Sequence, residues 1–193
     1  MLPDTSRQKT ILALGEGANG KPTWLAQLVA FIGKRNCCAM SLHKLETDRF
    51  AASRLVGKLA NICSDIPSAH LESTSTFKAI TGGDRIPGEY KYREPFDFLP
   101  FVRLVFSANH PPRSSDATYA FFRRWEVVPF NRTFEGEEQI PRHVLDAQLS
   151  EPKELSGLLN KALDALPGLR ANGFTETKSM ARPGRSLERA LIR

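Results

Sequence analysis

Residues 9–21 of the chain read KTILALGEGANGK. The first half of this stretch is a short apolar run typical of a buried strand, and its second half is rich in glycine. Residues 21–32 follow with apolar side chains at helical spacing, namely Trp24, Leu25, Leu28, Val29 and Ile32. A strand, a glycine-rich turn and a helix in this order predict a loop that wraps around phosphate groups.

Residues 15–21 of this stretch fit the pattern G-x-x-x-x-G-K. Glycines let successive backbone N–H groups turn toward a phosphate, the helix N-terminus adds a favourable dipole, and Lys21 reaches the outer phosphates. The alternative is a glycine-rich turn with an exposed lysine, but the agreement of strand, loop and helix favours nucleotide binding. The candidate nucleotide-binding residues are Gly15, Gly17, Asn19, Gly20, Lys21 and Thr23.

One position departs from this pattern. Pro22 stands where Ser or Thr would hold Mg²⁺, and it lacks both the hydroxyl and the backbone N–H. Thr23 supplies a hydroxyl one position later, about 100° further around the helix. The sequence therefore leaves two interpretations open: an ATPase, or a domain that binds nucleotide without turning it over.

The rest of the chain alternates strand-like and helix-like segments. The expected strands are residues 9–14, 37–42, 59–63, 102–106 and 125–130, and the expected helices are 21–32, 46–58, 73–80, 116–124 and 144–169, the last broken near Pro152. Residues 84–101 suggest a β-hairpin. We therefore expect an α/β fold of the P-loop NTPase type, with a mostly parallel central sheet, helices on both faces, an inserted hairpin and a C-terminal helical segment.

Polar residues follow three of the expected strands or helices. Asp65 comes after the strand at 59–63, where a carboxylate can hold Mg²⁺ and orient water. Asn109 follows the strand at 102–106, where an amide can position water or contact the γ-phosphate. Arg123 and Arg124 end a helix and suit the charge of a phosphoryl group in transfer. Taken singly, each also fits a turn or helix-end residue. The candidate catalytic residues are Lys21, Asp65, Asn109, Arg123 and Arg124, and the candidate metal ligands are Asp65 and Thr23.

The expected hairpin mixes basic and aromatic side chains. Single-stranded nucleic acid needs cations for its phosphates and rings for its bases, which makes Lys91, Tyr92 and Arg93 candidate DNA-binding residues. A solvated hairpin whose rings pack on the domain is the alternative, and its acidic residues weaken the basic character.

The composition of the chain limits the classes of protein to which it can belong. The chain has 193 residues, a net charge of +6, 41% hydrophobic and 25% charged residues, which predicts one globular domain. Residues 175–193 hold five basic and two acidic residues, so we expect a domain at 1–174 and a basic tail at 175–193. No apolar run is long enough to cross a bilayer. Three cysteines without metal-site spacing, and the absence of a leader, favour a reducing cytoplasm, that of a bacterial host.

Several segments together resemble the phage and plasmid primase-helicase proteins, which carry a superfamily 3 helicase domain related to the AAA+ ATPases. The segments are GEGANGK, RFAASRLVGKLANICSDIP, FKAITGGDRIPGEYKYREPFDFLPFVRLVFSANHPP and FFRRWEVVPF, and the similarity runs from about Ile11 to Phe174.

The resemblance implies roles for individual residues. Residues 15–21 match the Walker A loop, Asp65 the Walker B acid, Asn109 the sensor, and Arg123 or Arg124 the arginine that acts on a neighbour's ATP. Residues 78–92 match a motif whose hairpin contacts DNA, which makes Lys91 the foremost DNA contact. The resemblance implies ATP and Mg²⁺ as cofactors, single-stranded or origin DNA as substrate, and a homo-oligomeric ring, usually a hexamer, with no membrane partner.

The leading interpretation is therefore an ATP-dependent helicase or translocase domain of phage or plasmid replication. Because the loop begins at Gly15, the upstream primase region of family members is expected to be absent, and a separate primase would be a partner. The first alternative is a catalytically impaired nucleotide- and DNA-binding remnant, on account of Pro22. The second is a small nucleotide kinase, which would share the loop but need a lid with convergent arginines.

Overall fold

Strand β1 (Thr10–Leu14) lies between two parallel neighbours in the computed structural model, which describes residues 4–67, 69–116 and 118–175. These neighbours are β6 (Arg103–Ala108) and β7 (Trp125–Pro129). Beyond β6 lie β3 (Ala60–Cys63) and then β2 (Cys37–Cys38), so that the strand order is β2-β3-β6-β1-β7. The pairs are parallel throughout this sheet, which confirms the predicted fold class.

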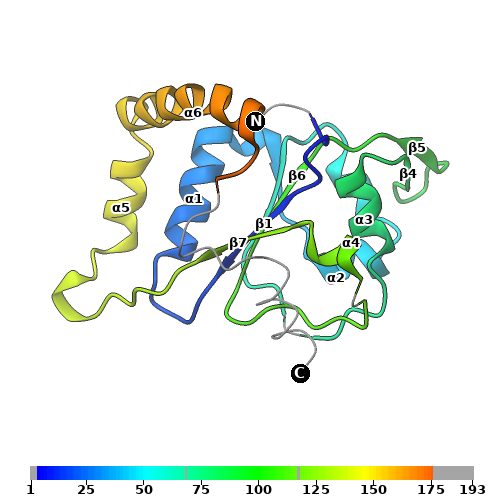
Figure 1. Cartoon of the computed structure of the whole chain (residues 1–193), viewed down its shortest axis with the longest axis horizontal. Helices are drawn as coiled ribbons and strands as arrows, with labels where there is room; N and C mark the ends of the chain where they lie inside the picture. Colours follow the sequence, from blue (N-terminus) through cyan, green and yellow to red (C-terminus); the bar gives the residue numbers. More distant parts are fainter. Residues whose placement is uncertain (1–3, 68, 117, 176–193) are drawn as a thin grey trace.

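Helices lie on both sides of the sheet (Figure 1). On one side is α1 (Lys21–Ile32), with α5 (Arg142–Leu149) and α6 (Pro152–Asn172) packed against it. The other side holds three shorter helices: α2 (Leu42–Thr47), α3 (Ser75–Gly82) and α4 (Tyr119–Phe122). Single 3₁₀ turns are η1 (Lys34–Asn36), η2 (Ala52–Leu55) and η3 (Gly136–Glu138).

The apolar run in β6 follows from burial on both faces. Leu104 and Phe106 point into the cluster that includes Trp125, whereas Val105 points to the opposite face and packs with Leu25 of α1. A strand covered on both faces needs apolar residues at successive positions rather than at alternate ones. This is why the sequence of β6 reads as a continuous apolar run.

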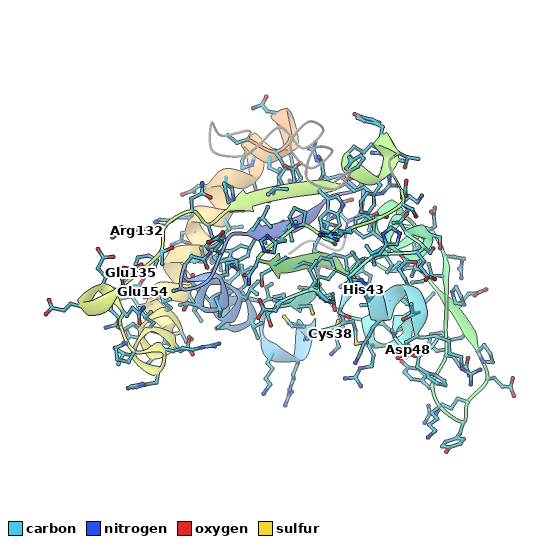
Figure 2. The ribbon with its side chains drawn as sticks, turned by 90° about the horizontal axis from the view of Figure 1, so that it is seen from below. Cys38, His43, Asp48, Arg132, Glu135 and Glu154 are labelled. Carbon is cyan, nitrogen blue, oxygen red and sulfur yellow. The ribbon has the colours of Figure 1, made fainter. Side chains whose placement is uncertain are left out.

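The hairpin expected over residues 84–101 is present. Strands β4 (Ile86–Gly88) and β5 (Phe96–Phe98) pair antiparallel, with Ile86 opposite Phe98. In Figure 2 the green hairpin projects away from the body of the molecule at the lower right. Its root packs on the domain, and its tip is exposed to solvent.

Three sequence expectations need correction. The helix predicted over 46–58 is wrong, because α2 begins earlier, at a Ser41 N-cap whose Oγ accepts the Lys44 N–H at 3.3 Å, and ends at Thr47. The small residues Ala51 and Ala52 are then buried in turns and in η2. The strand predicted over 37–42 is reduced to β2. The helix predicted over 116–124 is only the four residues of α4.

The C-terminal helical segment is broken as predicted. Helix α5 ends at Leu149, and α6 starts with Pro152 in its first turn, where proline costs no backbone hydrogen bond. The basic tail predicted at 175–193 lies outside the described residues except for Thr175. In the described part of the chain, every helix is too short or too polar to cross a membrane.

Candidate functional site

The glycine-rich loop lies at the carboxyl end of β1, between two strands that come much later in the sequence. Ligands of open α/β sheets bind at such a point, outside the carboxyl ends of strands whose order reverses. Gly20 adopts a left-handed conformation with φ of 82° immediately before α1. A Cβ on Gly15 would collide with the carbonyl oxygen of Phe130. The backbone conformation at Gly20 and the close approach of Phe130 at Gly15 therefore require glycine at these two positions.

Lys21 is almost fully buried, although it carries a charge. Its Nζ donates to the carbonyl oxygens of Gly15 and Glu16, the latter at 2.8 Å, and to Oδ1 of Asn109 at 3.2 Å. Burial lowers the pKa of Lys21, and the negative charge of Asp65 acts in the opposite direction. The ammonium group thus lies among the loop carbonyls, the amide of Asn109 and the field of Asp65.

Asp65 and Asn109 follow adjacent parallel strands, β3 and β6, and are both exposed at the same edge of the sheet. The backbone of Asp65 is left-handed, with φ of 50°, and its N–H donates to Oγ of Ser107 at 3.2 Å. The next N–H, that of Ile66, donates to the Ser107 carbonyl at 3.0 Å. Ser107 therefore fixes the turn that presents the Asp65 carboxylate.

Ser107 was not singled out from the sequence. It is 1% exposed and lies in the otherwise apolar run LVFSA of β6. A hydroxyl inside such a run, two residues before a polar strand end, is the signal that could have found it, because a buried hydroxyl needs a partner.

Asn19 acts on the loop itself. Its side chain is 6% exposed, its Nδ2 donates to the Phe130 carbonyl at 3.0 Å, and its Oδ1 accepts the Lys21 N–H at 3.4 Å. The N–H of Phe134 in turn donates to the carbonyl of Ala18 at 2.9 Å. The segment after β7 is therefore tied to the glycine-rich loop at two points.

Thr23 and Gly17 lie in different surroundings. Thr23 lines a cavity with Trp24 and Gln27 of the same helix, while Gly17 is exposed at the tip of the loop with free space where a Cβ would stand. Among the described residues, no group of three or more His, Cys, Asp or Glu side chains converges on one point. Asp65 supplies one exposed carboxylate at this edge of the sheet, and Mg²⁺ is commonly held by one or two carboxylates together with substrate phosphates.

The two arginines lie at the opposite, amino edge of the sheet. Arg124 precedes the first residue of β7, Trp125, which is paired with Thr10 at the start of β1. Strands rise about 3.3 Å per residue, so the length of β1 puts the arginines roughly 15 Å or more from the loop of the same chain. The structure thus brings Lys21, Asp65 and Asn109 together but separates the arginines from them.

The two arginines also differ from each other. Arg124 is 7% exposed, its Nε donates to Oγ1 of Thr81 at 2.8 Å, and its Nη1 donates to the Ala120 carbonyl. Burial lowers the pKa of Arg124, and the adjacent Arg123 acts in the same direction. Arg123 is partly exposed, and its Nη2 donates to Oε1 of Gln8.

The hairpin tip holds the three candidate DNA-binding residues. Lys91, Tyr92 and Arg93 are all exposed, and Tyr92 reaches 91% exposure in a left-handed turn with φ of 64°. The Nζ of Lys91 lies 4.9 Å from the centre of the Tyr92 ring. Tyr90, by contrast, stacks on Phe96 at 5.2 Å between ring centres and belongs to the root of the hairpin.

A family model matches residues 13–124, from within β1 to the residue before β7. The chain belongs to DUF5906, a family of unknown function. The DUF5906 region contains Lys21, Asp65, Asn109 and both arginines, so it covers the candidate site and the hairpin.

Beyond DUF5906 itself, the chain is similar to a protein of Acanthamoeba polyphaga mimivirus named "Putative helicase". The two are 30% identical over 141 residues, which cover 69% of this chain and 15% of that protein.

Solved structures with the same fold include three of the C-terminal region of NrS-1 without ligand. One of them has a TM-score of 0.59 at 15% identity, covering 77% of this chain and 36% of that one. Another, of residues 305–718, has a TM-score of 0.58 at 13% identity, covering 75% of this chain and 35% of that one. The chain thus spans about a third of these structures and a much smaller share of the mimivirus protein.

Proposed function

We propose that this chain is an ATP-dependent DNA helicase or translocase domain that acts in phage or plasmid replication. The observation on which this rests is the hydrogen bond between Lys21 and Asn109, which joins the phosphate loop to the strand end beside Asp65. The similarity to a mimivirus protein named as a helicase supports the same conclusion.

Each residue at the carboxyl edge of the sheet has its own role in ATP hydrolysis. The N–H groups at the start of α1 and the ammonium of Lys21 bind the phosphates. The Asp65 carboxylate would hold Mg²⁺ together with the phosphates, and the ion would supply positive charge to offset the charge of the phosphoryl group. Asn109, already within hydrogen-bonding distance of Lys21, positions the γ-phosphate or the attacking water.

An arginine must come from a second copy of the chain. Arg123 and Arg124 lie too far from the loop of their own chain, at the amino edge of the sheet. Arg123 is the better candidate, because Arg124 is buried and bonded to Thr81. This requirement is consistent with a ring, usually a hexamer, in which each amino edge faces a neighbour's carboxyl edge.

The hairpin tip supplies the contact with DNA. Lys91 and Arg93 attract the phosphates of a single strand, and the exposed ring of Tyr92 offers a surface on which a base stacks. The tip is far from the phosphate loop in the sequence. It lies on a projecting hairpin (Figure 2), so movement of the hairpin would move a DNA strand bound to it.

The test is the rate of ATP hydrolysis with and without single-stranded DNA. We expect stimulation by DNA and loss of activity in Lys21→Ala. The matched control is Lys34→Ala, which changes an exposed lysine in η1. Hydrolysis that is unchanged in Lys21→Ala would exclude the proposal.

A second candidate function is a nucleotide- and DNA-binding domain without turnover. Pro22 favours it, because this exposed residue in the first turn of α1 offers neither a hydroxyl nor an N–H to the phosphates. A Pro22→Ser variant discriminates between the two. A sharp rise in hydrolysis favours the impaired domain, whereas an unchanged and substantial rate favours the motor.

A further inference from the structure

A cavity of about 530 Å³ lies beside the phosphate loop, on the side of α1. Small-molecule sites commonly measure roughly 300–1,000 Å³ and combine apolar walls with a few polar groups. The loop contributes Asn19 and Gly20, α1 contributes Trp24, and Leu145 of α5 lies across from them. Since the loop lines this cavity and ends at Lys21, the cavity adjoins the position that we propose for the phosphates.

The outer wall of the cavity is the segment between β7 and α5. Figure 2 shows this segment, with Arg132 and Glu135 labelled, on the side of the molecule away from the hairpin. The hydrogen bonds from Phe134 to Ala18 and from Asn19 to Phe130 hold it against the loop. The wall is therefore placed by the same residues that shape the phosphate loop.

Two aromatic rings line this cavity. The Trp24 ring packs on Phe130 at 5.7 Å between ring centres, and the Phe134 ring lies near Gly20, where a Cβ would stand 3.8 Å away. Ile140, also in the lining, remains 51% exposed. Flat rings and open apolar surface are what a planar heterocycle covers on binding.

Gln139 gives the cavity a directional polar group. Its Nε2 donates to the carbonyl oxygen of Phe134 at 2.8 Å, which fixes the orientation of the side-chain amide. Because Nε2 is engaged with Phe134, the amide oxygen is the part of this exposed, cavity-lining side chain that is left to accept a hydrogen bond. An acceptor favours a base with an exocyclic amino group and disfavours one with a carbonyl oxygen at that position.

We propose that this cavity holds the base of the bound nucleotide and that Gln139 selects adenine over guanine. The proposal rests on the nucleotide-binding function above and deepens it. Trp24 and Phe134 provide the apolar contact, and the oxygen of Gln139 accepts a hydrogen bond from the amino group of adenine. Guanine would place its carbonyl oxygen opposite that acceptor, and neither oxygen can donate a hydrogen bond to the other.

The experiment compares three ligands on the full chain by calorimetry: ATP, GTP and inorganic tripolyphosphate. We expect ATP to bind at least about tenfold more tightly than GTP, since an unpaired polar group weakens binding. In Gln139→Ala, we expect the Kd for ATP to rise roughly fivefold, the effect of one hydrogen bond, with tripolyphosphate binding unchanged. Gln148→Ala, an exposed glutamine of α5 outside the cavity lining, is the matched control.

A second readout uses the native tryptophans. Trp24 lines the cavity, whereas Trp125 is fully buried in the core, so ATP should change the fluorescence of Trp24 and tripolyphosphate should not. Equal affinity for ATP and GTP, with no effect of Gln139→Ala, would overturn the base-site proposal. Tripolyphosphate binding that disappears in Lys21→Ala would still support the phosphate site. Failure of all three ligands to bind would instead overturn the proposed function, and the base site with it.

Discussion

The Nζ of Lys21 lies 3.2 Å from Oδ1 of Asn109, although the two residues are 88 positions apart in the sequence. One ends the phosphate loop after β1, and the other follows the adjacent strand β6. This hydrogen bond links the Lys21 ammonium, which is expected to bind phosphates, to the Asn109 amide, which is expected to contact the γ-phosphate or position water.

Replacing Asn109 with alanine should impair turnover more than nucleotide binding. Loss of one positioned polar group near a transferring phosphoryl group costs about 10²-fold in rate. We expect kcat for ATP hydrolysis to fall by that amount while the Kd for ATP changes little, because Lys21 and the loop remain. Asn36→Ala, on η1, is the control. A Kd that rises as much as kcat falls would contradict a role in positioning.

Replacing Ser107 with alanine should weaken metal use through Asp65. The Asp65 N–H loses its acceptor, which costs about 1 kcal/mol of folding free energy, measured by urea denaturation. If Ser107 has only a structural role, Ser107→Ala should show this loss of folding free energy and no other effect. We expect in addition a higher Mg²⁺ concentration for half-maximal hydrolysis. Ser107→Thr, which keeps a hydroxyl, should restore the Mg²⁺ dependence, and an unchanged dependence in Ser107→Ala would argue against the role.

Replacing Tyr92 with alanine should weaken binding to single-stranded DNA. A stacked base contributes about 1–3 kcal/mol, so we expect the Kd for an oligonucleotide to rise by about one order of magnitude or more. Tyr119→Ala is the matched control, since Tyr119 is also largely exposed, at 75%, but lies on α4. Fluorescence anisotropy provides the Kd. An equal effect of both substitutions would remove the hairpin tip from the DNA site.

The two adjacent arginines should respond differently to substitution. Arg124→Ala removes two hydrogen bonds from a buried position, so that Oγ1 of Thr81 and the Ala120 carbonyl lose the donors that they accept from, and we expect a loss of about 2–3 kcal/mol in the free energy of unfolding. Arg123→Ala should leave stability nearly unchanged and abolish hydrolysis. Mixing Arg123→Ala with Lys21→Ala subunits should restore part of the activity, because each supplies what the other lacks. No recovery on mixing would count against a shared site.

Stability should fall as the pH rises from about 9 to 11, and Cys38 should account for part of that fall. Burial raises the pKa of the Cys38 thiol from 9.0 to about 11. The unfolded chain ionises this thiol first, so the unfolded state gains free energy over that window and the folded state does not. Allowing for partial exposure to solvent, we expect on the order of 1–2 kcal/mol. Urea titrations at pH 8 and pH 10.5 should show a smaller difference for Cys38→Ala than for the unchanged chain.

Short-range sequence patterns were enough to predict part of this structure. The strand, loop and helix of residues 9–32 were predicted correctly because apolar spacing, glycines and the lysine all agree over a short range. The convergence of Asp65 and Asn109 also followed from the sequence, since parallel strands end at one edge. The helix expected over 46–58 failed because burial of Ala51 and Ala52 against the core favoured turns over helical periodicity.

Other parts of the candidate site depend on contacts that no local pattern encodes. The tie between Asn19 and Phe130 spans 111 positions. The segment that contains Phe134 and Gln139 reads as a charged loop, and its place beside the phosphate loop follows only from the position of β7 next to β1. The burial of Arg124 is likewise set by Thr81, which lies 43 positions earlier.

The separation of Lys21 from Arg123 has a consequence for symmetry. If the two parts act in one site, as we propose, head-to-tail association completes it, because the amino edge of one copy then meets the carboxyl edge of the next. A twofold dimer would complete the site only if one surface carried both parts, so that the arginine of each copy met the loop of the other. Head-to-tail association uses two different surfaces and produces either a closed ring or an open filament, according to the rotation between neighbours. The number of active sites would then equal the number of subunits in a ring, and a filament would leave one site incomplete at its end.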